Sequence, residues 1–310
     1  MRVLVTGGAG FIGSHLVEEL VKRKHKVRVL DNLSTGRMEN LEAVEKKIEF
    51  IKGNISDKPT VDEAMKGCKQ AYHLAAMVSV QDSIQNPVKT WDINIRGTLL
   101  VLGAAKKEKV TKRVVLSSSA AVYGDAFGLP KMEDGSLQPK SPYGESKHIN
   151  EMNAVKYWKD YGLETVCLRY FNVYGPRQVP DSPYSGVITK FVRAGLKGAR
   201  PVIYGDGKQT RDFVYVGDVV KANMLAMEAA KAPGEIFNIG TGKETSILRL
   251  WNEVAGLTKS KQKPKFEDER QGDIYRSYAS IGKAQKMLKY KPEWELKKGL
   301  GETVEWMKNA

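Results

Sequence analysis

The chain has 310 residues, of which 41% are hydrophobic, and 50 Lys and Arg against 36 Asp and Glu give it a formal net charge of +14. This length and composition exclude a disordered tail or a disulfide-stapled miniprotein, and at roughly 150 residues per domain they indicate about two structural units. Cys68 and Cys167 form no CxxC pair and the four histidines lack metal-ligand spacing, so we expect no metal site.

The positive charge is compatible with nucleic acid, an acidic membrane surface or a small polyanionic ligand. The basic residues form no RGG tract and no array interleaved with aromatic residues, so we expect no nucleic-acid partner. The chain opens on a strand-like run, and no segment approaches about 18 uninterrupted apolar residues. We therefore expect a cytoplasmic protein without a membrane partner.

Short β-rich apolar runs alternate with longer helical patterns through the first 170 residues, which predicts βαβ units. Runs such as 3–5 and 114–116 are apolar on both faces, as strands of a helix-covered parallel sheet must be. We therefore predict an α/β fold with a Rossmann-type doubly wound parallel sheet. Its strands are expected at residues 2–6, 26–31, 48–52, 70–74, 113–117 and 165–169.

Beyond residue 175 the density of Pro and Gly rises and helical patterns such as 187–195 and 247–255 are separated by irregular loops. This change predicts a Rossmann domain over residues 1–175 and a smaller lobe, which would shape a substrate site, over 176–310. The boundary is soft, because residues 212–216 form another strand-like run that could return to the first sheet.

A glycine-rich turn joins the first predicted strand to a helix expected over residues 11–24. Gly7, Gly10 and Gly13 have the spacing GxxGxxG, which lets the chain turn tightly, approach a pyrophosphate and pack the helix closely on the strand. Asp31, at the end of the second predicted strand, can accept hydrogen bonds from both ribose hydroxyls and would repel a 2′-phosphate. Because Asn32 and Leu33 offer no cation to neutralise that phosphate, the sequence favours NAD over NADP.

Tyr143 and Lys147 lie four residues apart after Pro142, so a helix places them on the same face. A neighbouring ammonium and the charge of oxidised nicotinamide would stabilise the phenolate, which makes Tyr143 a candidate proton acceptor. Three serines end the strand that begins near Arg113, at the ligand-facing carboxyl edge of the predicted sheet, where a hydroxyl can hold a substrate oxygen.

Six motifs, in order, resemble those of the extended short-chain dehydrogenase/reductases and, within them, the nucleotide-sugar 4-epimerases. They are TGGAGFIGSH (6–15), DNLSTG (31–36), HLAA (73–76), SSSAAVYG (117–124), SPYGESK (141–147) and LRYFNVYGPR (168–177). The resemblance covers nearly the whole chain and implies NAD as cofactor and a homodimer built by helices near 88–107 and 143–161. It also implies Ser119 as the catalytic hydroxyl, Tyr143 as the base and Lys147 as the lysine that additionally holds the nicotinamide ribose.

The resemblance implies a set of cofactor contacts: Gly7, Gly10, Phe11, Ile12, Gly13, Asp31, Asn32, Asn54, Ile55, Leu74, Ala75, Ala76, Tyr143, Lys147 and Phe171. Asn54 departs from the family pattern, which has an aspartate that accepts from the adenine amino group. An Asn carbonyl can accept the same bond.

Two alanines distinguish the expected reaction from its relatives. Similar dehydratases carry an Asp-Glu pair after the catalytic hydroxyl, and similar decarboxylases keep a glutamate there, whereas this chain has Ala120 and Ala121. The resemblance implies that all these enzymes first oxidise C4 of the sugar to a ketone. Because the methyl groups of alanine cannot transfer protons, this ketone can only be reduced again by return of the hydride. We therefore expect C4 epimerisation of a UDP-hexose. The alternatives are a UDP-glucuronate 4-epimerase and a non-catalytic NAD-sensing protein.

The resemblance also implies the residues that bind the UDP-sugar: Ser79, Ser119, Tyr143, Asn172, Val202, Tyr204, Arg211, Arg270, Asp273 and Ser277. Tyr204 and Val202 match contacts to uracil. The two arginines and Asn172 match diphosphate contacts, for which forked guanidinium donors are suited, and Asp273 matches a carboxylate near the uridine ribose. Ser277 occupies a position that is tyrosine in enzymes confined to UDP-glucose and UDP-galactose, and Ser79 resembles a serine of the N-acetylhexosamine group. The small Ser277 therefore predicts turnover of UDP-N-acetylglucosamine and UDP-N-acetylgalactosamine, with UDP-glucose and UDP-galactose also accepted.

Overall fold

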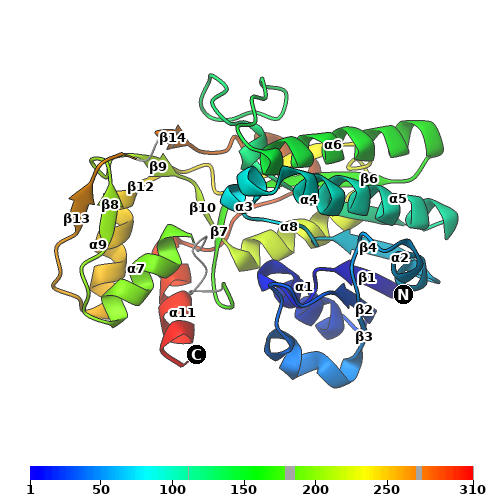
Figure 1. Cartoon of the computed structure of the whole chain (residues 1–310), viewed down its shortest axis with the longest axis horizontal. Helices are drawn as coiled ribbons and strands as arrows, with labels where there is room; N and C mark the ends of the chain where they lie inside the picture. The colour runs from blue at the N-terminus through cyan, green and yellow to red at the C-terminus, as the bar shows by residue number, and fades with distance from the viewer. Residues whose placement is uncertain (111, 179–185, 270–273, 310) are drawn as a thin grey trace.

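The computed structural model of the chain describes residues 1–110, 112–178, 186–269 and 274–309. Its central strands are β1 (Arg2–Thr6), β2 (Lys26–Asp31), β3 (Ile48–Lys52), β4 (Gln70–His73), β5 (Arg113–Ser119), β6 (Thr165–Tyr170) and β11 (Ile236–Ile239). Within the described residues these seven form one parallel sheet in the order β11-β6-β5-β4-β1-β2-β3 (Figure 1). The order reverses between β1 and β4, which confirms the predicted doubly wound fold and places a ligand crevice at the carboxyl ends of those strands.

Helices cover both faces of the sheet because alternate strand residues point to opposite sides. Val3 and Val5 pack with the helices α1 (Phe11–Lys22) and α8 (Val216–Glu228) in one core. Leu4 belongs to a second core, formed with α2 (Lys58–Met65), α5 (Gly97–Lys107) and α6 (Pro142–Tyr161). Shorter helices complete this part: η1 (Met38–Lys47), α3 (Val80–Gln85), α4 (Pro87–Trp91), η2 (Asp92–Arg96), η3 (Ala120–Val122) and α10 (Gly282–Leu288).

A smaller lobe lies to one side of the sheet, where α7 (Val187–Leu196), α9 (Ile247–Thr258) and α11 (Leu296–Asn309) pack together around Trp251 (Figure 1). Its strands are short: β8 (Val202–Tyr204) pairs with β13 (Lys265–Glu267), and β9 (Thr210–Arg211) lies between β12 (Thr245–Ser246) and β14 (Arg276–Ser277). Among the described residues, no helix combines the length and the apolar run needed to cross a bilayer.

The predicted strands at 2–6, 26–31 and 48–52 coincide with β1, β2 and β3. β5 and β6 run further than predicted, to Ser119 and Tyr170, because these polar ends continue to pair with each other in register. The strand-like run at 212–216 does not join the central sheet: β10 (Phe213–Tyr215) pairs with β7 (Asn172–Tyr174) instead. The strand that returns to the sheet is β11, which pairs with β6.

Candidate active site

The glycine turn forms a cradle between β1 and α1 that has no room for side chains. Gly7 has φ +71°, and a Cβ on Gly13 would lie 2.0 Å from the Gly7 carbonyl oxygen. Gly10 offers no side-chain cap to α1, so the first-turn N–H groups of this helix keep their capacity for an external anion. Phe11 and Ile12 begin the helix, and both contact the apolar core of the smaller lobe. This cradle fits the pyrophosphate of a dinucleotide.

Asp31 ends β2 beside the cradle and is buried. Its Oδ2 accepts from the Ala9 N–H at 3.0 Å and its Oδ1 accepts from the Leu33 N–H at 2.8 Å. The Asp31 carboxylate thus holds the glycine-rich turn in place. From the sequence we predicted only a contact with the ribose, not this local role. Arg37, an exposed residue whose backbone N–H donates to the Ala9 carbonyl, stands further along the same loop, so this loop does carry a cation beyond Asn32 and Leu33.

The other predicted cofactor positions surround this turn. A Cβ on Gly7 would lie 2.7 Å from the Ala75 nitrogen, so the turn after β4, with Leu74, Ala75 and Ala76, lies directly against the cradle. Ile55 is buried. The side-chain Oδ1 of Asn54 accepts from the Ser56 N–H at 3.1 Å, a local turn that uses one of its two lone pairs. Phe171 is also buried, with its ring 6.1 Å from that of Tyr123.

Tyr143 and Lys147 lie in the first two turns of α6, as predicted. Ser141 caps this helix by accepting from the Gly144 N–H at 3.1 Å, and Pro142 occupies its first turn, where its fixed φ is favourable. The Tyr143 hydroxyl is hydrogen-bonded to Ser119 at the end of β5. Lys147 Nζ lies 5.8 Å from the centre of the Tyr143 ring and donates to the Ser117 carbonyl oxygen at 2.9 Å. The structure therefore brings the three predicted catalytic side chains together.

Burial dominates the electrostatics of this group. It raises the pKa of the Tyr143 phenol, an effect that the hydrogen bond with Ser119 opposes. Burial also lowers the pKa of Lys147 to about 8, against the opposing charge of Glu151. Tyr143 therefore stays protonated, and cannot accept a proton, until another positive charge, such as an oxidised nicotinamide, enters the site and stabilises the phenolate.

A buried polar network behind these residues was missed from sequence. The element η2 is a π-helix that contains Asn94, whose Nδ2 donates to Ser146 Oγ of α6 at 3.0 Å. Thr98 donates to the Asn94 carbonyl and accepts from His73 Nε2, while His73 Nδ1 accepts from Thr6 at the end of β1. Burial lowers the pKa of His73 to about 3, so this ring is neutral and ties β1 and β4 to α6. π-helical turns occur often at functional sites. The sequence contains no residue pattern from which we predicted this one.

Apart from Ser119 and Tyr143, the described residues predicted to bind the sugar nucleotide fall into two sets: Val202, Tyr204, Arg211 and Ser277 lie on short strands of the smaller lobe, whereas Asn172 begins β7 and Ser79 precedes α3. Ser277 on β14 is the register partner of Arg211 on β9, so these two positions are neighbours. Asn172 donates from its backbone to the Asp212 carbonyl at 3.0 Å, and Ser79 caps α3 by accepting from the Asp82 N–H. Val202 and Tyr204 begin and end β8, and Val202 is exposed. Arg270 and Asp273 lie outside the described residues.

Comparison with known proteins identifies this arrangement. The model of the NAD dependent epimerase/dehydratase family matches residues 3–240. The chain belongs to this family. Its members are NAD-dependent, and the glycine cradle and Asp31 are consistent with that cofactor.

Three relatives match this chain along nearly their whole length. A UDP-glucose 4-epimerase of Mycolicibacterium smegmatis is 39% identical over 100% of this chain and 99% of its own. The structure of a UDP-N-acetylglucosamine 4-epimerase of Methanobrevibacter ruminantium, in complex with UDP-N-acetylmuramic acid, is 40% identical with a TM-score of 0.95, covering 99% of this chain and 98% of that one. A UDP-glucuronic acid 4-epimerase of Bacillus cereus, in complex with UDP-glucuronic acid and NAD, is 32% identical with a TM-score of 0.91, covering 100% and 99%.

Another reaction is represented among the relatives. A UDP-N-acetyl-alpha-D-glucosaminuronate decarboxylase of Bacillus cytotoxicus is 37% identical over 99% of this chain and 98% of its own. Overall similarity therefore establishes the family, but it leaves the choice of sugar and of reaction to the residues of the site.

Replacing Asp31 with alanine should weaken NAD binding and narrow the preference for NAD over NADP by about 10-fold or more, because a charged acceptor and a repulsive charge disappear together. Titration calorimetry of the cofactor-free protein with each dinucleotide measures both effects. Glu39→Gln, which removes an exposed carboxylate from η1, is the control and should leave the ratio unchanged. Tighter binding of NADP by the unaltered protein would contradict the role of Asp31, and Arg37→Ala would then test the neighbouring cation.

Proposed function

We propose that this protein interconverts UDP-hexoses at C4 through a transient 4-ketose, acting on UDP-N-acetylglucosamine and UDP-N-acetylgalactosamine as well as UDP-glucose and UDP-galactose. The observation that carries the proposal is the grouping of Ser119, Tyr143 and Lys147 at the carboxyl edge of β5, next to Ala120 and Ala121 of η3. The group can remove and return one proton. The adjacent alanines provide no acid for loss of a hydroxyl and no base for removal of a second proton.

In this mechanism Tyr143 takes the proton of the C4 hydroxyl and Ser119 holds the same substrate oxygen. Lys147, fixed by Ser117, supplies positive charge beside the phenolate. The cradle of Gly7, Gly10 and Gly13 would hold NAD, which would supply reversible acceptance of a hydride from C4. Tyr143 then gives its proton back to the oxygen after the ketose has presented its other face, so the cycle consumes no net proton.

The smaller lobe is proposed to anchor the nucleotide while the sugar turns. Arg211 lies on β9, which pairs with β12 on one side and with β14 on the other. Its forked guanidinium is suited to bind the diphosphate from this fixed position. The buried Asp212 reinforces this place by accepting from the backbone N–H groups of Thr241, Gly242 and Ala279. Val202 and Tyr204 are proposed to contact uracil, and Asn172 the diphosphate.

The choice of sugar is proposed from two small residues. Ser277 lies beside Arg211. A sugar whose diphosphate binds Arg211 would therefore pass the small side chain of Ser277, where enzymes confined to UDP-glucose and UDP-galactose have a bulky tyrosine. Ser79 is buried at the start of α3, where its oxygen already accepts one N–H and its hydroxyl can still donate. Both residues leave space for an acetamido group at C2.

We also propose that the protein is a homodimer, assembled on the helices expected from the resemblance. Large apolar side chains are exposed along these helices: Val88 and Trp91 on α4, Leu99 on α5 and Met152 on α6 have exposed fractions of 74%, 40%, 37% and 52%. An exposed apolar face of this kind suits association between copies.

Tyr143→Phe should lower turnover of UDP-glucose by roughly 100-fold or more, since a positioned base is lost while the ring is kept. A coupled assay of UDP-galactose formation measures this effect. Tyr157→Phe, on the same helix and away from the site, is the matched control and should retain normal turnover. Near-normal turnover by folded Tyr143→Phe protein would remove this residue from the mechanism.

Ser277→Tyr should suppress turnover of UDP-N-acetylglucosamine about 5- to 150-fold more than that of UDP-glucose, because overpacking affects only the larger substrate. Ser277→Ala is the control that removes the hydroxyl without adding bulk. The comparison is made with all four UDP-hexoses and UDP-glucuronate. If the unaltered enzyme turns over neither N-acetylated sugar, the interpretation of Ser277 is wrong, and activity confined to UDP-glucuronate would replace the proposed substrates.

A further inference from the structure

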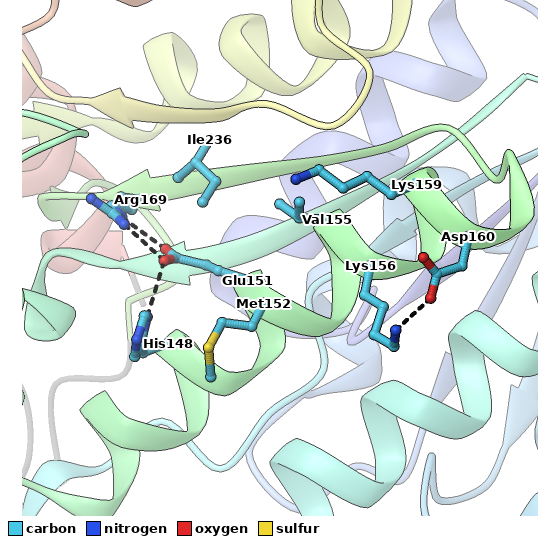
Figure 2. Close-up of a pocket in the computed structure, with 9 residues that line it drawn as sticks. All are labelled: His148, Glu151, Met152, Val155, Lys156, Lys159, Asp160, Arg169 and Ile236. Atoms are coloured by element: carbon cyan, nitrogen blue, oxygen red, sulfur yellow. Dashed lines mark hydrogen bonds and ion pairs between the residues drawn. The ribbon is translucent and has the colours of Figure 1, made fainter.

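Glu151 lies on the same face of α6 as the catalytic pair, since Tyr143, Lys147 and Glu151 follow one another at intervals of four residues. Its side chain is 1% exposed and forms a two-pronged ion pair with Arg169 of β6 (Figure 2). Arg169 Nε donates to Oε1 and Nη2 donates to Oε2, both at 2.8 Å. A buried carboxylate needs such partners, and here they are complete.

The same carboxylate holds the end of β5. Ser118 Oγ donates to Glu151 Oε1 at 2.6 Å. Ser118 stands between Ser117, which accepts from Lys147, and Ser119, which is hydrogen-bonded to Tyr143. Of the three serines that end β5, Ser118 is therefore the one that pairs with neither Tyr143 nor Lys147, and Glu151 holds it in place.

Arg169 extends this hold to the other side of Ser119. Its Nη1 donates to the Tyr123 hydroxyl at 2.9 Å, and Tyr123 in turn donates to Asn238 Oδ1 of β11 at 2.6 Å. Tyr123 directly follows η3, the short helix that begins after Ser119. The chain is thus held before Ser119 by Glu151 and after it by Arg169.

We propose that Glu151 is a positioning residue for the reaction proposed above, holding Ser119 and Lys147 in register with Tyr143 through Ser118 and Arg169. The inference rests on the proposed function, because it concerns the alignment of the groups that carry it. Small displacements of such groups reduce turnover strongly, even when substrate still binds.

The charge of Glu151 acts on the site as well. Burial alone would raise the pKa of Glu151, but the hydrogen bonds from Arg169 and its other donors hold it below the usual value, so the carboxylate stays ionised. It opposes the loss of the Lys147 proton. The other titratable groups facing Glu151 are His148, whose Nδ1 is 3.8 Å from Oε2, and Tyr123 beyond Arg169, while His73 and Cys167 face Lys147.

A cavity of about 380 Å³ reaches this ion pair between α6 and the edge of the sheet, where Ile236 of β11 lines it (Figure 2). Glu151, Arg169 and His148 line it, together with the exposed residues Met152 and Lys159. Shortening the Glu151 side chain would therefore open a space that a small carboxylate can enter from solvent, next to the guanidinium of Arg169.

The first experiment compares two glutamates that each pair with an arginine of a central strand, Glu151 with Arg169 of β6 and Glu164 with Arg113 of β5. Glu151→Gln should lower kcat about 10- to 100-fold with little change in KM. Glu164 pairs with Arg113 at the opposite ends of β5 and β6, with 2.7 Å between Nη2 and Oε2, and Glu164→Gln is the matched control. The control should alter thermal stability but leave kcat unchanged.

The pH profile separates positioning from mere stability. Activity that needs protonated Lys147 is present below its pKa and falls as the pH rises through that value. Losing the Glu151 charge lowers this pKa, so the alkaline limb of the kcat profile should move to lower pH by roughly 0.5 to 1 unit in Glu151→Gln but not in Glu164→Gln.

Chemical rescue provides a second test. Formate should restore kcat of Glu151→Ala several-fold, whereas chloride at equal ionic strength should not, because only a carboxylate can bridge Arg169 and Ser118 from the cavity. If the Glu151 variants do not fold, Ser118→Ala removes a single donor and should still lower kcat by about 3- to 10-fold.

The outcomes distinguish this inference from the proposed function. If the unaltered protein converts no UDP-sugar, the proposed function fails. If the unaltered protein is active, a normal kcat and an unmoved alkaline limb in folded Glu151→Gln overturn the positioning role. Where the Glu151 variants do not fold, a normal kcat in Ser118→Ala overturns it. Equal losses in Glu151→Gln and Glu164→Gln would also overturn it, since they would indicate general destabilisation.

Discussion

The site depends on one alignment, that between the last three residues of β5 and one face of α6. Ser117 accepts from Lys147, Ser118 donates to Glu151, and Ser119 is hydrogen-bonded to Tyr143. Four residues of a helix advance by about 6 Å and two residues of a strand by about 6.6 Å, so Tyr143 and Lys147 can meet Ser119 and Ser117 at the same time. All three contacts are polar and that of Ser118 with Glu151 is fully buried, so a shifted register would leave buried polar groups without partners.

Much of the rest of the sheet serves to keep this alignment. The His73 ring connects β4 to α5 and, through Asn94, to the start of α6. Arg169 connects β6 to the same helix from the other direction. The proposed catalytic group thus stands on two elements that these contacts hold in place, β5 and α6, whereas the proposed sugar-binding residues of the smaller lobe stand on short strands. Three of the relatives are epimerases of different UDP-sugars, with glucose, N-acetylglucosamine or glucuronic acid.

The sequence allowed the fold and the catalytic group to be predicted because both depend on local patterns. Apolar strands of five or six residues, glycines at fixed intervals and a Tyr–Lys pair one helical turn apart are each visible in the chain itself. The contacts of Asp31 with Ala9 and Leu33 were not foreseen, because a carboxylate next to a turn can satisfy that turn as well as a ligand. The π-helical turn at Asn94 and the pairing of Glu151 with Arg169 depend on packing between distant segments, which spacing alone does not reveal.

The late return of the chain to the central sheet affects how the protein can be made. β11 completes the sheet beside β6, and α8 covers Val115, Val166 and Leu168, yet both elements come after residue 215. A ribosome that has released only the glycine cradle and the catalytic helix has therefore produced a sheet with an open edge and an uncovered apolar face. Because such surfaces aggregate, the nascent chain needs protection until about residue 239 has emerged. The nucleotide-binding half thus cannot be separated from α8 and β11, and both halves of the site mature together.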